Sequence, residues 1–180
     1  MDTRMHILDT AESLFNQHGY TAVGVDKIRD EASVSKTSLY RHFGGKEGLI
    51  DAVLARRHAR MLESMNEAVA LAGDTVEAKL TALLDWHLTW FKRDDFYGCM
   101  FMHVLGEMKT QSVSNSHQAQ QHKMALSALV SDILGDEYQA NTEFVMIFLE
   151  GLIVRAEFDT LPFSRAAYLQ MLFKSASIIE

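Results

Sequence analysis

Apolar residues recur along this chain every three to four positions, the spacing that places them on one face of an α-helix. No run of strict apolar–polar alternation is long enough to predict a β-strand. The pattern is clear in residues 2–18, where one apolar stripe precedes the helix-ending Gly19. Its members are Ile7, Leu8, Ala11, Leu14 and Phe15. The sequence therefore predicts an all-α fold.

The same pattern predicts about nine helices. Pro162 is the only proline, which favours long uninterrupted helices because proline breaks helix interiors. Ser35 is expected to cap the third helix, and Asp74 with Glu77 resembles a capping box at the start of the fifth. The expected helices cover residues 2–18, 25–32, 36–43, 46–71, 75–92 and 98–108, then from a polar loop at 110–116 to a stop at Gly135, then 140–159 and 164–179.

The formal net charge of −7 seems to oppose nucleic-acid binding, but the charge is unevenly distributed. Residues 1–60 carry a balance of +1, whereas residues 61–180 carry −8. The segment Ser35–Arg60 contains six basic residues and only two acidic ones. A window of this kind can be an ordinary solvated surface, so the charge alone does not identify a DNA-binding site.

Two short helices joined by the turn at residues 33–35 form a helix-turn-helix pattern. Its second helix, residues 36–43, has to lie in the DNA major groove and offer donors to base edges and phosphates. Leu39 and Phe43 are expected to be its buried anchor. A plain helical subdomain would explain the charges but not the crowding of hydroxyl, Tyr and Arg side chains on two turns. The candidate DNA contacts are Lys36, Thr37, Ser38, Tyr40, Arg41, His42 and Lys46.

Residues 7–50 resemble the N-terminal domain of the tetracycline-repressor (TetR) family of bacterial regulators. The matching residues are Ile7-Leu8-Asp9-Thr10-Ala11-Glu12-Ser13-Leu14-Phe15, Gly19-Tyr20, Ile28, Ala32, Val34-Ser35-Lys36, Leu39-Tyr40-Arg41-His42-Phe43 and Lys46-Glu47-Gly48-Leu49-Ile50. The resemblance implies a homodimer that binds a palindromic operator, usually as a repressor released by a small ligand. It also places the seven candidate side chains on the DNA-contacting positions.

Three positions depart from the family pattern. Gly24 stands where a Ser or Thr cap is common, Arg29 replaces a small residue, and Ser33 replaces the glycine that usually opens the turn. Arg29 either contacts a phosphate or pairs with Asp26 or Asp30. None of these departures removes a side chain that is expected to face the groove.

The remainder of the chain, residues 49–180, is expected to be a helical ligand-sensing and dimerisation domain behind a DNA-binding domain of residues 1–48. His87 lies near the middle of a wide apolar arc and is flanked by Trp86 and Trp90. It is either a satisfied core histidine, as such residues usually are, or a polar group in an aromatic pocket. With Phe101 and Met102 from the soft segment 96–103, these three residues are the candidate contacts for an unidentified hydrophobic or aromatic ligand.

Other chemistry has little support in the sequence. Cys99, the only cysteine, is interpreted as a buried thiol in preference to a redox sensor. The pairs His117/His122 and His103/Glu107 lack a third metal ligand, so we predict no metal and no cofactor. No phosphate loop, nucleophile elbow or metalloprotease helix is present, which argues against an enzyme.

The eighth predicted helix is apolar almost all round, which requires burial in a core or against a second chain. We expect a homodimer through the last two helices. Arg155 lies on this apolar side, either in an interface ion pair, which we favour, or against an anionic ligand. The longest apolar run, Phe144 to Leu149, is too short to span a bilayer, and no secretory signal is evident, so we expect a cytoplasmic protein without membrane contact.

Taken together, the sequence predicts a ligand-responsive, operator-binding repressor. The alternative is a helical small-molecule-binding protein that has no DNA-reading activity.

Overall fold

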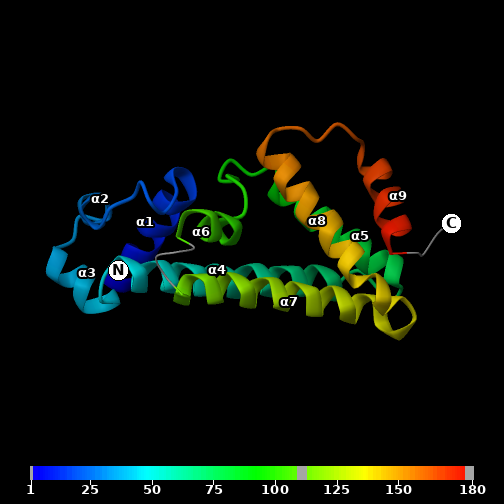
Figure 1. Cartoon of the computed structure of the whole chain (residues 1–180), viewed down its shortest axis with the longest axis horizontal. Helices are drawn as coiled ribbons and strands as arrows, with labels where there is room; N and C mark the ends of the chain where they lie inside the picture. Colours follow the sequence, from blue (N-terminus) through cyan, green and yellow to red (C-terminus); the bar gives the residue numbers. More distant parts are fainter. Residues whose placement is uncertain (1, 109–112, 177–180) are drawn as a thin grey trace. The chain divides into compact units, whose positions relative to one another are not determined.

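The computed structural model describes residues 2–108 and 113–176 and confirms the all-α class, since no strand occurs in these ranges. The end of the last predicted helix, with Ile178 and Ile179, and part of the predicted loop at 110–116 lie outside the described residues. Figure 1 labels the elements. They are α1 (Thr3–His18), α2 (Val25–Glu31), α3 (Lys36–Phe43), α4 (Lys46–Ala70), α5 (Val76–Trp90), α6 (Met100–Met108), α7 (Val113–Tyr138), η1 (Gln139–Asn141), α8 (Thr142–Glu157) and α9 (Arg165–Ser175).

The helices group into two compact units that are discontinuous in sequence. The first consists of Met1–Ala59 and Cys99–His122, and the second of Arg60–Gly98 and Lys123–Glu180. Helix α6 therefore packs with the helix-turn-helix, although the sequence-based division at residues 48 and 49 places it in the second domain. Helices α4 and α7 each contribute residues to both units.

Local signals explain where several helices begin and end. Ser35 caps α3 as predicted, because its hydroxyl accepts a hydrogen bond from the Ser38 amide at 3.0 Å. The predicted capping box at α5 is wrong: Thr75 is the cap, and its hydroxyl accepts from the Ala78 amide at 3.2 Å. The predicted stop at Gly135 appears as a break inside α7, where this residue has φ 61° and ψ −175°.

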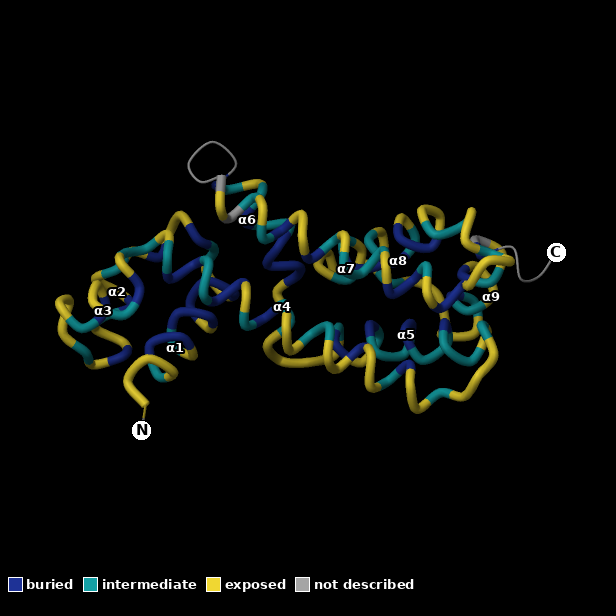
Figure 2. Tube along the Cα trace, turned by 90° about the horizontal axis from the view of Figure 1, so that it is seen from below, coloured by how far each residue is buried: buried dark blue, intermediate teal, exposed yellow. Residues whose placement is uncertain are grey.

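The core of the first unit is built on the apolar stripe of α1. Ile7, Leu8, Ala11 and Phe15 are almost fully buried, and Leu49 at the start of α4 is completely so. Figure 2 shows these buried stretches in dark blue along α1 and the beginning of α4. The predicted inward face of the first helix is therefore confirmed.

The second unit has its own core, formed by buried side chains of α4, α5, α7, α8 and α9. Its fully buried members include Leu80 and Leu84 of α5 and Val145 of α8. Among the described residues, none of the helices is long and apolar enough to cross a membrane.

Candidate DNA-reading helix and ligand cavity

Helix α3 presents one face to the core and the other to solvent. Leu39 is fully buried and Phe43 nearly so, which confirms the predicted anchor. Lys36, Thr37 and Arg41 lie on the exposed side, and Tyr40 is 46% exposed. Anchoring one side of a short helix fixes the direction in which the other side points. The arrangement is therefore that of a helix which can enter a DNA groove.

A small network of ion pairs links α2 to the start of α3. The Arg29 guanidinium lies 2.9 Å from Asp26 and 2.6 Å from Asp30. Lys36 Nζ lies 3.2 Å from the same Asp26 oxygen. Of the two roles open to Arg29, the structure shows the pairing, with both aspartates. Lys36 and Asp26 are both more than half exposed, so exchanging their ion pair for a phosphate costs little, about 1 kcal/mol or less.

His42 and Lys46 are less accessible than the other candidate contacts. Both are half-buried, and Nε2 of His42 is shielded from solvent without a hydrogen-bond partner among the described residues. A DNA contact from this ring therefore has to come from Nδ1. Burial lowers the pKa of Lys46, while the Glu107 carboxylate acts in the opposite direction. Lys46 lies in the first turn of α4, where free backbone amides also favour an anion.

Two of the six basic residues in the segment Ser35–Arg60 form ion pairs within the protein, so they add no positive charge to the face expected to contact DNA. Arg56 contacts Asp9 at 2.7 Å and Glu12 at 2.6 Å, and Arg57 contacts Glu12 at 3.2 Å. Glu12 and both arginines are largely buried. These pairs tie α4 to α1, a role that sequence reasoning missed. The positive surface of the segment Ser35–Arg60 is therefore smaller than its six basic residues suggest.

Helix α6 holds the connection between α1 and α2 at both of its ends. Near the start of α6, the Met100 carbonyl accepts a hydrogen bond from the Tyr20 hydroxyl at 3.1 Å. Near its end, the Glu107 carboxylate accepts from the Thr21 amide at 2.7 Å. Gly19 has φ 79°, and a Cβ there would lie 2.8 Å from a Glu107 oxygen. We call these two hydrogen bonds the α6 clasp, which no pattern in the sequence indicates.

The five predicted ligand contacts do not lie around one space. His87 is 3% exposed and lines an internal cavity of the second unit. Trp86 and Trp90 lie close to its ring, at 5.1 and 6.5 Å between centroids, but they line an open hollow between α4 and α5 instead. Phe101 belongs to the first unit, where it stacks on His122 at 3.7 Å.

The remaining sequence candidates have plain structural surroundings. Met102 is half-buried in the first unit, and Cys99 is a buried free thiol, as interpreted from the sequence. Glu107, which has a metal-binding spacing with His103, accepts the Thr21 hydrogen bond of the α6 clasp. Within residues 2–108 and 113–176, no three His, Cys, Asp or Glu side chains gather as metal ligands.

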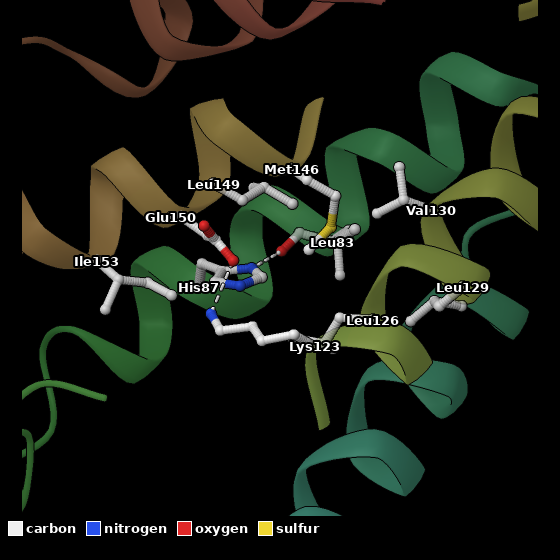
Figure 3. A pocket seen from close by; sticks show the side chains of 10 residues that line it. All are labelled: Leu83, His87, Lys123, Leu126, Leu129, Val130, Met146, Leu149, Glu150 and Ile153. Carbon is white, nitrogen blue, oxygen red and sulfur yellow. Dashed lines mark hydrogen bonds and ion pairs between the residues drawn. The ribbon is translucent and has the colours of Figure 1, made fainter. Parts of the chain in front are cut away.

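The cavity at His87 lies among α5, α7 and α8 and is small, with a volume of about 20 Å³. Most of its wall is aliphatic. Three polar side chains share it, and Figure 3 shows the His87 ring beside the ion pair of Lys123 and Glu150. The pattern along α5 alone does not predict the lining residues that come from α7 and α8, Met146 among them. The other lining residues are Leu83, Leu126, Leu129, Val130, Leu149 and Ile153.

Helices α8 and α9 leave apolar side chains uncovered in the single chain. Phe144 is 62% exposed and Ile147 65% exposed. Arg155 is exposed too, and its Nε donates to the Thr160 carbonyl at 3.2 Å. The core of the single chain therefore does not bury α8 on most sides, and burial against a second chain stays a prediction. An open hollow with an apolar wall runs beside these residues and includes Phe148, Gly151, Leu152, Leu161, Pro162, Phe163, Tyr168 and Met171.

Comparisons with known proteins agree with the helix-turn-helix. Residues 7–53 match the profile of bacterial regulatory proteins of the TetR family. The transcriptional repressor NemR of Escherichia coli K12 is 29% identical over 108 residues, which are 59% of this chain and 54% of NemR. The transcriptional activator FasR of Mycolicibacterium smegmatis is 34% identical over 88 residues, 47% of this chain and 40% of FasR. The chain thus matches about half of the length of these relatives.

The similarity in structure extends over nearly the whole chain. A TetR-family transcriptional regulator from Streptomyces coelicolor superposes with a TM-score of 0.82 at 22% identity, covering 97% of this chain and 92% of that one. At this identity the likeness establishes the fold, including the helical domain that follows the helix-turn-helix.

Proposed function

Because the chain belongs to the TetR family of bacterial regulatory proteins, we propose that it is a ligand-responsive transcriptional regulator that binds operator DNA as a dimer. The observation that carries this proposal is the exposed face of α3, held by the buried Leu39 and Phe43. Repression is the direction we propose, released by a small molecule, as the repressor NemR is among the matching relatives. The cytoplasm is the expected location.

In the proposed complex, α3 lies in the major groove. Arg41 and Lys36 would donate to base edges or phosphates, and Tyr40 would place its hydroxyl on the backbone. Thr37 and Ser38 lie on the first turn of α3, the end that meets base edges in helix-turn-helix proteins. Phosphate contacts release counterions, so binding weakens steeply with salt.

We propose the apolar side chains of α8 and α9 as the dimer interface. A second copy of the chain would cover Phe144, Ile147 and Met171, which otherwise contact water. In a twofold interface each copy presents the same patch to the other. Two helix-turn-helix domains joined in this way can bind a palindrome whose half-sites are about 34 Å, or a multiple of that distance, apart.

The cavity at His87 is the proposed ligand site. Its walls come from α5, α7 and α8, and α7 is continuous into the residues that pack with the helix-turn-helix. A ligand that shifts α7 therefore acts on a helix with residues in both units. Coupling between ligand and operator is typically about 1–3 kcal/mol.

The test is a gel-shift titration with DNA from upstream of the protein's own coding region, at low and physiological salt. We expect tight binding at low salt and a strong decrease as salt increases. Arg41→Ala should weaken binding by about tenfold or more, whereas Lys92→Ala, an exposed basic residue of the second unit, should not. Equal behaviour of both variants would favour the alternative, a helical small-molecule-binding protein without DNA reading.

A further inference from the structure

The exposed side of α8 carries a pattern that is symmetric about Gly151. Phe144, Ile147, Gly151, Arg155 and, directly after the helix, Phe158 are all exposed, and we call these five residues the α8 stripe. The two phenylalanines lie seven residues to either side of Gly151, and Ile147 and Arg155 lie four residues to either side. At about 100° per residue, all five lie within about 40° of one line along the helix. The α8 stripe therefore has the same spacing in both directions along the chain.

Gly151, at the centre of the α8 stripe, suits close contact with a second helix. Glycine is unfavourable in a helix interior compared with alanine. The single chain gives no packing reason for it, since nothing outside the adjacent backbone of α8 lies within 4 Å of the position of an added Cβ. The flanking phenylalanines are an independent observation: Phe158 is 73% exposed, and apolar side chains of this size gathered on one exposed face mark an interaction surface.

The partner that this pattern fits is a second copy of the chain. In a twofold pair, each copy presents the same patch to the other. If the two α8 helices run antiparallel and cross at Gly151, residues at equal distances on either side of this glycine meet. Phe144 of each copy then lies against Phe158 of the other. Ile147 of each copy lies beside Arg155 of the other, where the aliphatic stem of the arginine can pack on it.

Arg155 argues against the parallel arrangement. In a parallel pair each residue would meet its own counterpart, so the two Arg155 guanidiniums would lie side by side. Nε of Arg155 donates to the Thr160 carbonyl at 3.2 Å, and among the described residues no carboxylate pairs with this guanidinium. Two like charges without a compensating acid repel each other. The charge therefore favours the antiparallel direction.

The open hollow beside the α8 stripe provides room for the second copy. It has a volume of about 360 Å³, and its wall includes Gly151, Arg155 and Phe163. In the antiparallel register, the part of the second α8 that precedes its Gly151 passes over the Arg155 end of this hollow. Large apolar side chains that fill such a pocket contribute much of the binding energy of an interface. Phe144 and Ile147 of the second copy are the side chains in this position.

We propose that two copies of the chain pair their α8 helices antiparallel, crossing at Gly151, with Phe144 of each copy against Phe158 of the other. This inference rests on the proposed function, because it gives the direction and the register of the proposed dimer interface. The choice of α8 and α9 as the interface leaves both of these open.

Disulfide cross-linking of the full chain tests the register with two variants, Phe144→Cys and Phe158→Cys. One of them carries an affinity tag that changes its mass, and both are produced in the same cells and then oxidised. A disulfide requires Cα atoms about 4.4–6.8 Å apart, so only residues that meet can be linked. We expect the mixed disulfide to predominate, and either variant produced alone to give little cross-linked dimer. The unchanged protein, whose Cys99 is buried, is the control and should give none.

Two results would overturn the register. Efficient linking of Phe144→Cys to itself would indicate a parallel pair. Absence of the mixed disulfide in a protein that sediments as a dimer would place the crossing at another residue.

Gly151→Leu tests the close approach without relying on cross-linking. A leucine here has open space in the single chain, so the variant should fold, but it would separate the two α8 helices. We expect the dissociation constant of the dimer to increase roughly tenfold or more, as overpacking at a close contact does. Gly106→Leu, at a helical glycine of α6 with the same open surroundings, is the matched control and should leave the dimer unchanged. Analytical ultracentrifugation measures both, and equal dissociation constants would overturn the crossing at Gly151.

The register and the proposed function fail in different ways. Operator binding by a dimer that links Phe144→Cys to itself would overturn the register alone. The mixed disulfide in a protein that binds no operator DNA would overturn DNA reading and leave the register standing. Operator binding by a protein that sediments only as a monomer would overturn the register and the dimer while DNA reading stands.

Discussion

At the scale of single residues, the protonation of His87 has the clearest consequence for stability. Burial is the main cause of its low pKa; the Leu83 carbonyl opposes the shift and the Lys123 ammonium adds to it. An ordinary histidine in the unfolded chain has a pKa near 6.5. The unfolded state therefore takes up a proton at a higher pH than the folded state does.

We predict that the protein loses stability as pH falls from 6.5 to 4. In that window the unfolded chain binds a proton at His87 and the folded chain does not, which lowers the free energy of unfolding by up to about 3 kcal/mol in total. Above pH 6.5 this contribution is constant. Urea unfolding at several pH values, compared with His87→Asn, measures it. A constant difference between the two proteins from pH 7 to pH 4 would contradict the prediction.

Single residues were predictable where the information is local. Ser35 as a cap and Leu39 as an anchor follow from spacing within one short helix, and the burial of His87 follows from its arc. The partners Lys123 and Glu150 did not follow, because they come from two other helices. A pattern along one element gives the face that is buried but not what it is buried against.

At the scale of elements, the α6 clasp fixes the turn between α1 and α2. We predict that Glu107→Gln lowers the free energy of unfolding of the full chain by about 0.5–1.5 kcal/mol, because an amide accepts from the Thr21 N–H less strongly than a carboxylate does. Chemical denaturation measures the change. Glu67→Gln, at an exposed site on α4, is the control and should have almost no effect. An equal decrease in the free energy of unfolding of both variants would show that the α6 clasp does not stabilise the protein.

The junction of α3 and α4 depends on close packing at Gly48. A Cβ at this residue would overlap the Phe43 carbonyl oxygen, so the backbone would have to move. We predict that Gly48→Ala destabilises the protein by about 1–3 kcal/mol and weakens operator binding, since α3 is displaced.

Gly106 is the matched control for this prediction. It lies in α6, and nothing occurs within 4 Å of the position of an added Cβ. Gly106→Ala should therefore stabilise the protein by about 0.5–1 kcal/mol, as alanine does in helix interiors. Thermal melts of both variants measure whether each one is more or less stable than the original protein. A change in the same direction for both would count against the close packing at Gly48.

Helix positions were well predicted, and the errors lie where two signals compete. Asp74 and Thr75 can both cap a helix, and only the folded chain shows that Thr75 does so. The inclusion of α6 in the first unit was not predictable, because it depends on contacts of Tyr20 and Thr21 with residues far along the chain.

At the scale of the whole molecule, the proposed binding of operator DNA requires the pairing of two chains. We predict that Ile147→Glu converts the dimer to a monomer at micromolar concentration and lowers operator affinity by about two orders of magnitude or more, because two tethered readers act at high effective concentration. Analytical ultracentrifugation and gel shifts measure the two effects. Leu71→Glu, at a leucine that is 88% exposed and lies between α4 and α5, is the control. Retention of the dimer by Ile147→Glu would place the interface elsewhere.

The position of the two tryptophans has a spectroscopic consequence. Trp86 and Trp90 are the only tryptophans of the chain, and both belong to the second unit. Light absorbed at 295 nm therefore excites no residue of the helix-turn-helix, and Trp emission reports on the second unit. We expect operator DNA to change this emission if the two units are coupled, so an optical titration of the unlabelled protein tests the coupling that the proposed regulation requires.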